Sequence, residues 1–259
     1  MTVYQVDAFA DKVFSGNPAA IIPLNEWLDD DLMQKIAMEN NLSETAYFVK
    51  TQEGYHLRWF TPDYEIDLCG HATLASAFVI KKHIEPSIEI IHFTTQKAGV
   101  LKVICEGEMF TLDFPSRPPQ PCEIANQLFA SLGIDNAVEV LKARDYFVVL
   151  KNEEEVKKLQ PDFMLMKQLD TIGVIATAKG DSAEVVSRCF YPGAGIPEDP
   201  VTGSAHCNII PYWAGKLGKN EFRAKQLSQR GGDLLCALRG ERVLMSGTAV
   251  EFMKGEIKI

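Results

Sequence analysis

The chain has 259 residues, a length that suits two domains of about 120–130 residues each. Its hydrophobic content of 46% and charged content of 24% are those of a globular protein whose core needs no disulfide staples. The net charge of −9, without any run of lysine and arginine, argues against binding to nucleic acid or to an anionic membrane surface.

The predicted elements of the first half are mostly strands. Alternating apolar and polar residues predict a strand over residues 3–9, then a turn at 15–18 and a strand at 19–22. A helix is expected over residues 28–41, whose first turn carries three aspartates that suit the positive end of its macrodipole. Further strands are expected at 45–50, 56–60, 88–94, 100–106 and 109–114, and a second helix at 72–82.

Four prolines within residues 115–121 predict a linker between two domains. The second half repeats the pattern of the first. We expect a helix at 124–132, connecting or amphipathic segments at 153–160 and 162–169, and a loop at 191–198. Strands are expected at 146–150, 173–178, 184–191, 234–238, 242–246 and 249–253. Many strands and one long buried helix in each half predict an α+β fold, not a doubly wound parallel sheet.

The six cysteines form no CxxC pair and have no histidines at zinc-ligand spacing, so they are expected to be reduced thiols with no metal site. Residues 1–7 have neither the basic nor the apolar region of a signal peptide. No apolar run approaches the roughly 18 residues that span a bilayer. These observations predict a cytoplasmic protein.

Two stretches of the sequence echo each other, residues 67–73 and residues 199–206. Each is a polar, glycine-containing turn that runs into an apolar helix, and their glycines lie 203 − 70 = 133 residues apart. The same offset pairs Gly99 with Gly232 and Gly107 with Gly240. The placement of the matches at turn glycines favours an ancient duplication into two similar domains, although coincidence remains an alternative.

Each echoing turn brings free backbone N–H groups to a helix start, where they can bind a carboxylate or a phosphate. Gly70 and Gly203 let a ligand approach the backbone closely. Ordinary capping of the helix by Asp, Thr or Ser is the alternative. The sequence contains neither GxGxxG after a strand nor GxxxxGK[ST], so neither turn is a dinucleotide or P-loop motif.

Three residues are candidates for proton chemistry. His71 follows Gly70 at the start of a helix, which favours a neutral imidazole able to shuttle a proton, unless it only caps the turn. Glu44 lies where a helix ends and an apolar strand begins, so it is either a partly buried acid/base or a solvated loop glutamate. Asp199 precedes the second turn and by itself would be interpreted as an N-cap.

These motifs together resemble the PhzF family, named for the phenazine-biosynthesis isomerase, over essentially the whole chain. The motifs that carry the resemblance occur in this order: Gly16-Asn17-Pro18, Ser43-Glu44-Thr45-Ala46, Phe60-Thr61-Pro62 with Glu65, Cys69-Gly70-His71-Ala72-Thr73, and Glu198-Asp199-Pro200-Val201-Thr202-Gly203-Ser204-Ala205. The resemblance implies the fold of diaminopimelate epimerase, in which two pseudo-symmetric domains each wrap a curved mixed sheet around a central helix, with a cleft between them. The expected domains are residues 1–116 plus 248–259, and residues 117–247.

The resemblance also implies a cofactor-independent isomerase or epimerase that needs no metal, acts on a small anionic or zwitterionic metabolite and forms a homodimer. Glu44 would move a proton between carbons of the substrate, with His71 and Asp199 assisting. The substrate carboxylate would be bound by the residues that match the family's binding turns, namely Gly70, Ala72, Gly203 and Ser204.

Related epimerases use one cysteine from each domain as opposing acid and base. Cys69 occupies the first of these positions, but its counterpart at the offset of 133 is Thr202, so a two-cysteine mechanism is disfavoured. A protein that kept the cleft and binds a small metabolite without catalysis is the alternative. It would bind the ligand without exchanging protons at the ligand's carbon, and intact Glu44, His71 and Asp199 weigh against it.

Overall fold

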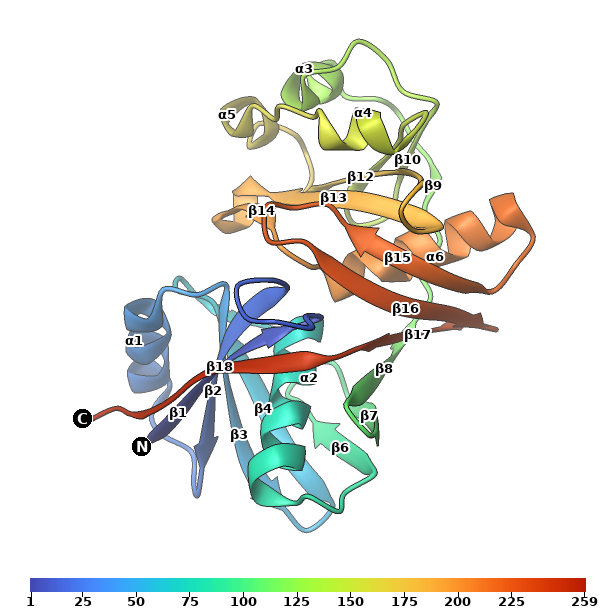
Figure 1. Ribbon diagram of the computed structural model, residues 1–259. Coiled ribbons are helices and arrows are strands. Elements are labelled where there is room, and N and C mark those ends of the chain that lie inside the picture. Colours follow the sequence, from blue (N-terminus) through green and yellow to red (C-terminus); the bar gives the residue numbers. More distant parts are fainter. The chain divides into compact units, whose positions relative to one another are not determined.

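The computed structural model describes residues 1–259, and the chain divides into two units (Figure 1). Unit 1 consists of Met1–Phe114 and Leu244–Ile259, and unit 2 of Pro115–Val243. The chain therefore crosses from unit 1 to unit 2 at the proline-rich segment and returns near its C-terminal end.

Unit 1 is built around helix α2, whose residues are all buried. Its elements are β1 (Thr2–Ala8), β2 (Asn17–Leu24), α1 (Asp30–Asn40), β3 (Glu44–Thr51), β4 (Gly54–Phe60), β5 (Glu65–Ile66), α2 (Gly70–Val79), η1 (Ile80–Ile84), β6 (Ile90–Thr94), β7 (Val100–Glu106), β8 (Met109–Pro115) and β18 (Ala249–Glu256).

The sheet of unit 1 mixes parallel and antiparallel pairs. β1 pairs antiparallel with both β18 and β2, and β2 runs parallel to β3. β3 pairs antiparallel with β4, β4 runs parallel to β6, and β6, β7 and β8 form an antiparallel meander. Helix α2 contacts β1, β2, β3, β7 and β18, so the curved sheet surrounds it. Met33 and Ile36 of α1 pack with Tyr47 and Phe60 into a second apolar cluster.

Unit 2 is built in the same way around helix α6. Its elements are β9 (Gln120–Pro121), α3 (Leu128–Leu132), β10 (Glu139–Lys142), β11 (Tyr146–Val149), α4 (Glu153–Lys157), α5 (Phe163–Met166), β12 (Val174–Lys179), β13 (Val185–Tyr191), η2 (Pro192–Ala194), β14 (Ile196–Asp199), α6 (Gly203–Leu217), β15 (Glu221–Gln226) and β16 (Gly232–Arg239). Strand β17 (Arg242–Gly247) lies where the chain leaves unit 2.

The strand pairings of unit 2 repeat those of unit 1 one by one. β10 pairs antiparallel with β9 and β11, and β11 runs parallel to β12. β12 pairs antiparallel with β13, β13 runs parallel to β15, and β15 pairs antiparallel with β16. Helices α3, α4 and α5 cover the face of the sheet opposite α6 (Figure 1). They supply residues such as Leu128, Val156 and Met166 to the hydrophobic core on that face. The predicted α+β fold of two domains with the same topology is confirmed.

Several predicted elements differ at their ends. The helix predicted at 72–82 begins at Gly70 and ends at Val79, where a π turn continues to Ile84. The helix predicted at 124–132 is reduced to Leu128–Leu132, because Ile124 is exposed and the buried apolar contacts begin only at Leu128. The loop predicted at 191–198 overlaps β14, which begins at Ile196 and pairs with β13 with a shift in register. The glycines and prolines of this segment gave no sign of a strand.

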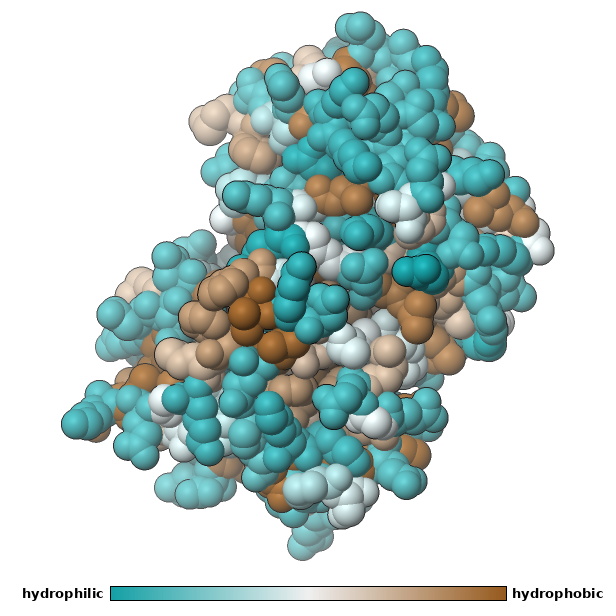
Figure 2. Space-filling model, in the orientation of Figure 1, coloured by the Kyte–Doolittle hydropathy of each residue, from teal (hydrophilic) through white to brown (hydrophobic).

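None of the helices is both long and apolar enough to cross a membrane. Hydrophilic residues cover most of the face drawn in Figure 2, and apolar residues gather in a patch left of its centre.

Candidate active site

The starts of three elements meet at one edge of the sheet in unit 1. Asn17 is the first residue of β2 and Glu44 the first of β3, and the parallel pairing of these strands places both starts at the same edge. Cys69 is the N-cap of α2 and His71 its second residue. All four side chains are buried, so the fold gathers four polar groups in one place away from water.

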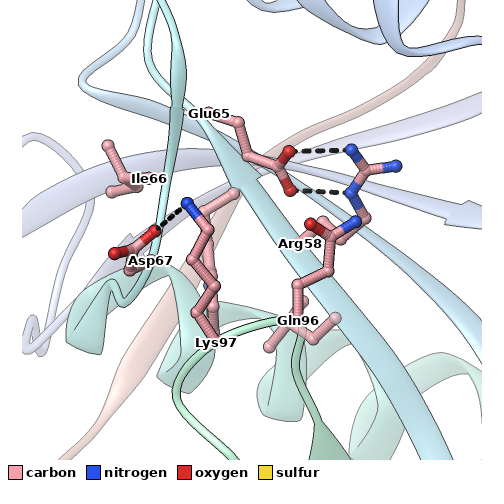
Figure 3. A pocket seen from close by; sticks show the side chains of 8 residues that line it. Arg58, Glu65, Ile66, Asp67, Gln96 and Lys97 are labelled. Carbon is pink, nitrogen blue, oxygen red and sulfur yellow. Dashed lines mark hydrogen bonds and ion pairs between the residues drawn. The ribbon is translucent and has the colours of Figure 1, made fainter.

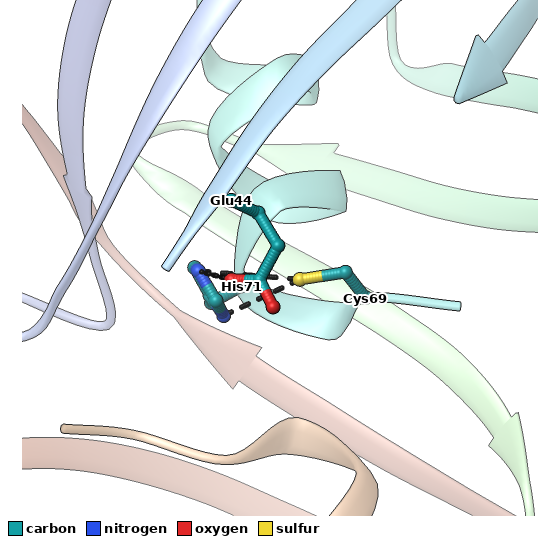
Figure 4. Close-up of side chains that lie close together, drawn as sticks. All are labelled: Glu44, Cys69 and His71. Carbon is teal, nitrogen blue, oxygen red and sulfur yellow. Dashed lines mark hydrogen bonds and ion pairs between the residues drawn. The ribbon is translucent and has the colours of Figure 1, made fainter. Parts of the chain in front are cut away.

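The imidazole of His71 contacts both a carboxylate and a thiol (Figure 4). Its Nε2 is 3.0 Å from Oε2 of Glu44, and its Nδ1 is 3.4 Å from Sγ of Cys69 and 3.1 Å from Nδ2 of Asn17. Glu44 and His71, both predicted from the sequence as candidates for proton chemistry, are therefore in contact in the structure.

Apart from the contact with His71, Oε2 of Glu44 accepts no hydrogen bond although it is buried. A buried carboxylate without its full set of donors is costly for folding. Such a cost is common at functional sites, where an oxygen that can accept a further hydrogen bond is available to a ligand or a substrate proton.

The protonation of His71 differs from the sequence-based expectation. Burial alone would lower the pKa of His71, but charge interactions and hydrogen bonds with Cys69 and Glu44 outweigh it and hold this pKa well above the ordinary value. Burial, followed by the charge of Glu44, raises the pKa of the Cys69 thiol to about 11. The expectation of a neutral imidazole, drawn from the helix dipole, was wrong because it omitted the contacts with Cys69 and Glu44.

Glu44, Cys69 and His71 have the ligand types of a metal site, and their ligand atoms lie within 4.8 Å of one another. The hydrogen bonds fit a metal poorly. If Nδ2 of Asn17 donates to Nδ1 of His71, a neutral ring carries its proton on Nε2, facing Glu44. A protonated ring carries protons on both nitrogens, and the amide of Asn17 then has to turn its oxygen toward Nδ1 to accept a hydrogen bond from it. In either state Nε2 holds a proton, so this cluster suits proton transfer better than metal coordination.

In unit 2, Asp199 is the last residue of β14 and is also buried. It accepts a hydrogen bond of 2.6 Å from Oγ1 of Thr202, the N-cap of α6. Gln226 of β15 donates through Nε2 to the carbonyl of Asp199 and accepts through Oε1 from the N–H of Thr202. Asp199 is thus not the N-cap; it is one member of a buried network that fixes the turn before α6.

The helix starts match each other in detail. Neither N-cap, Cys69 in α2 or Thr202 in α6, forms a side-chain capping hydrogen bond, so the ordinary capping considered for these turns is absent. Four residues after each N-cap a side chain donates back to the N-cap carbonyl, from Thr73 to Cys69 and from Nδ1 of His206 to Thr202. The uncapped first turns leave backbone N–H groups available for an anion.

The remaining candidate binding residues lie at these starts. Gly70 and Ala72 are buried in the first turn of α2, whereas Gly203 is buried and Ser204 partly exposed in the first turn of α6. Asn17 and Gln226 were not predicted as site residues. Asn17 could have been found from its Gly16-Asn17-Pro18 motif, whereas nothing in the sequence around Gln226 indicates that it fixes a turn.

Two units of the same mixed topology, each with a helix start at a cluster of buried polar groups, define the class of epimerase-like folds. A hydroxyproline epimerase of Agrobacterium vitis, crystallised with trans-4-hydroxy-L-proline, shares this fold with a TM-score of 0.65 at 11% identity, covering 98% of this chain and 91% of its own. At this identity the likeness concerns the fold alone.

The phenazine biosynthesis-like protein family, PhzC-PhzF, matches residues 6–255, and the chain belongs to this family. An uncharacterized isomerase of Pseudomonas aeruginosa is 49% identical over 259 residues, which are 100% of this chain and 99% of that protein. The crystal structure of a PhzF family protein of Enterococcus faecalis superposes with a TM-score of 0.96 at 50% identity, covering 100% of this chain and 99% of its own. The family resemblance inferred from the sequence is confirmed.

Proposed function

We propose that this protein is a cofactor-independent isomerase or epimerase that moves a proton on a small carboxylate- or amino-acid-type substrate, with Glu44 as the general acid/base. The observation that carries the proposal is the buried pair of Glu44 and His71, in which Oε2 lies 3.0 Å from Nε2 and accepts no other hydrogen bond. Membership of a family whose relatives are named isomerases supports the reaction class.

In the proposed reaction Glu44 takes a proton from an acidic C–H of the substrate and returns it to a carbon. His71 donates a charge-assisted hydrogen bond to Glu44 or to the developing anion, which its raised pKa favours. Asp199, held by Thr202, assists the transfer. The uncapped first turns, with Gly70 and Ala72 in one and Gly203 and Ser204 in the other, bind the substrate carboxylate.

The test is a screen of carboxylates and amino acids in deuterated water, followed by NMR or mass spectrometry of the small molecule. We expect the substrate to gain deuterium at a carbon, and Glu44→Gln to slow this exchange by about 10²–10⁴-fold, the usual contribution of a general acid/base. Exchange at the wild-type rate in Glu44→Gln would remove Glu44 from the mechanism.

The same screen separates catalysis from mere binding. A non-catalytic metabolite-binding protein would bind a carboxylate tightly, as seen by calorimetry, yet leave its C–H bonds free of deuterium. A control variant, Glu221→Gln, changes an exposed glutamate that pairs only with Arg239 and should exchange label as the wild type does. A homodimer and a biosynthetic role in the cytoplasm are part of the same proposal, and size-exclusion chromatography with light scattering tests the dimer.

A further inference from the structure

Each unit contains an arginine that holds a glutamate with two parallel hydrogen bonds. In unit 1, Arg58 donates from Nε and Nη2 to the two carboxylate oxygens of Glu65 at 2.7 and 2.8 Å (Figure 3). In unit 2, Arg188 donates from the same two nitrogens to Glu198, again at 2.7 and 2.8 Å. We call these two ion pairs the clamps.

The clamps occupy equivalent places in the two units. Arg58 lies in β4 and Arg188 in β13, two residues before Phe60 and Phe190, and each guanidinium carbon lies 5.1 Å from the ring of that phenylalanine. Glu65 and Glu198 lie in the short strands β5 and β14, which fold back on β4 and β13. The offset between the glutamates, 198 − 65 = 133, is that of the echoing turns.

Each clamp ends close to a helix start. From Glu65 to the first residue of α2 is 70 − 65 = 5 residues, and from Glu198 to the first residue of α6 is 203 − 198 = 5. The connecting segments carry the N-caps, Cys69 and Thr202, which have no side-chain caps of their own. An ion pair with both hydrogen bonds in a fixed plane restrains the short strand, and with it the turn that follows.

A third hydrogen bond ties each arginine to a layer outside the sheet. Nη1 of Arg58 donates to Asp30 at the start of α1, at 2.8 Å. Nη1 of Arg188 donates to the carbonyl of Leu159, after α4, at 2.9 Å. The side chain of Arg58 is buried, at 6% exposed, and that of Arg188 is mostly covered, at 12% exposed, so the geometry of each clamp is set by packing and is not a loose surface contact.

We propose that Arg58–Glu65 and Arg188–Glu198 are positioning residues that set the two uncapped helix starts for binding a substrate carboxylate. The inference rests on the proposed function for the identity of the bound group. The clamps do not touch the proton that moves, so their loss weakens binding of the carboxylate and spares the transfer step.

The first test measures amide hydrogen exchange by mass spectrometry in Glu65→Gln, Glu198→Gln and the control Glu221→Gln. The control removes the charge of an exposed glutamate that pairs with Arg239 and lies beside no helix start. We expect Glu65→Gln to speed exchange of residues 67–73 about tenfold and to leave residues 200–206 unchanged, with the converse for Glu198→Gln. Wild-type exchange at both turns, or faster exchange spread over the whole chain, overturns the proposal.

The second test uses the carboxylate that gains deuterium in the screen described above. In Glu65→Gln we expect KM to rise about tenfold and kcat to change by less than about threefold, the pattern of lost substrate binding. A loss confined to kcat, or a lower melting temperature with unchanged KM, overturns the role. Arg58→Lys keeps the charge but loses the paired hydrogen bonds, so it should behave like Glu65→Gln; wild-type KM in this variant would contradict the clamp.

The two tests separate the inference from the proposed function. If no carboxylate takes up deuterium, the proposed function fails, and hydrogen exchange at the two turns still decides whether the clamps hold them. If a substrate is found but both turns exchange at wild-type rates, the clamps fail and the function stands.

Discussion

Nε2 of His71 and Oε2 of Glu44 lie 3.0 Å apart, and both side chains are more than nine-tenths buried. His71 lies at the start of helix α2 and Glu44 at the start of strand β3. The pair therefore forms only because the start of α2 packs next to the starts of the parallel strands β2 and β3. A charged pair removed from water responds to pH and to the loss of either partner far more than a surface pair does.

The raised pKa of His71 makes stability depend on pH. The folded protein holds this proton more tightly than the unfolded chain, whose histidine titrates near 6.5, so the stabilisation is complete below pH 6.5 and is lost as pH rises through the folded pKa. Above pH 6.5 the free energy of unfolding of the wild type should fall by up to about 1.4 kcal/mol per pH unit relative to His71→Gln. Urea unfolding of both proteins at several pH values measures the difference.

Parallel curves for the two proteins would contradict this prediction. Because His71→Gln is a buried change and can fail to fold, a second measurement uses the wild type alone. The ring protons of His71, followed by NMR against pH, should titrate above 6.5, whereas His206, whose pKa burial lowers to about 4, should stay neutral.

Cys69 should not be the group that moves the proton. Burial raises the pKa of its thiol to about 11, so almost no thiolate is present at neutral pH. Cys69→Ser should therefore retain deuterium exchange into the substrate within about tenfold of the wild type, far less than the loss caused by Glu44→Gln. A loss as large as that of Glu44→Gln would instead make the thiol an acid or base of the reaction. Cys105→Ser, a buried change in β7, is the control.

Gln226 should matter for stability more than its residue type indicates. Its side chain bonds the N–H and hydroxyl of Thr202 and the carbonyl of Asp199, all of them buried. Gln226→Ala leaves these groups without that partner and should lower the free energy of unfolding by about 1–3 kcal/mol. Gln120→Ala, at an exposed position, should change it by less than about 0.5 kcal/mol. Equal urea midpoints for the two variants would refute the role of Gln226.

Removal of the last strand should destabilise unit 1. β18 forms the antiparallel partner of β1 along its length, from Thr2 with Glu256 to Ala8 with Ala249. A chain that ends at Gly247 should therefore unfold at lower urea than the wild type and exchange the amides of β1 faster, because that edge of the sheet is exposed. A chain that lacks only residues 258–259, which follow the hydrogen bonds between Ile257 and Met1, is the control. Wild-type exchange in β1 of the shorter chain would show that β18 is dispensable.

The sequence predicts much of the framework because periodicity and turn glycines are local signals. The strand ends of β1, β4 and β8 fall within a residue or two of their predicted positions. Glu44 and His71 were found through motifs and then placed in contact by the fold. The charge state of His71 could not be predicted, since it depends on a carboxylate 27 residues away in sequence, 71 − 44 = 27.

The missed features share one cause, which is dependence on contacts between distant segments. Gln226 is in an ordinary strand pattern, and only the approach of β15 to the turn before α6 gives it a role. β14 lies among glycines and prolines that indicate a loop, and its pairing with β13 is what makes it a strand. The clamps were missed for the same reason, because an arginine and a glutamate on two strands give no sign of pairing.

The order of the strands along the chain has a consequence for how such a protein could have arisen. The chain can be cut into two halves of nine strands, β1–β9 and β10–β18. In each half the ninth strand pairs with the first strand of the other half, β9 with β10 and β18 with β1. A gene encoding one half alone would leave one side of its first strand without a partner, and two copies would complete each other by exchanging their last strands. Duplication and fusion of such a gene would turn a strand-swapped dimer into a single chain.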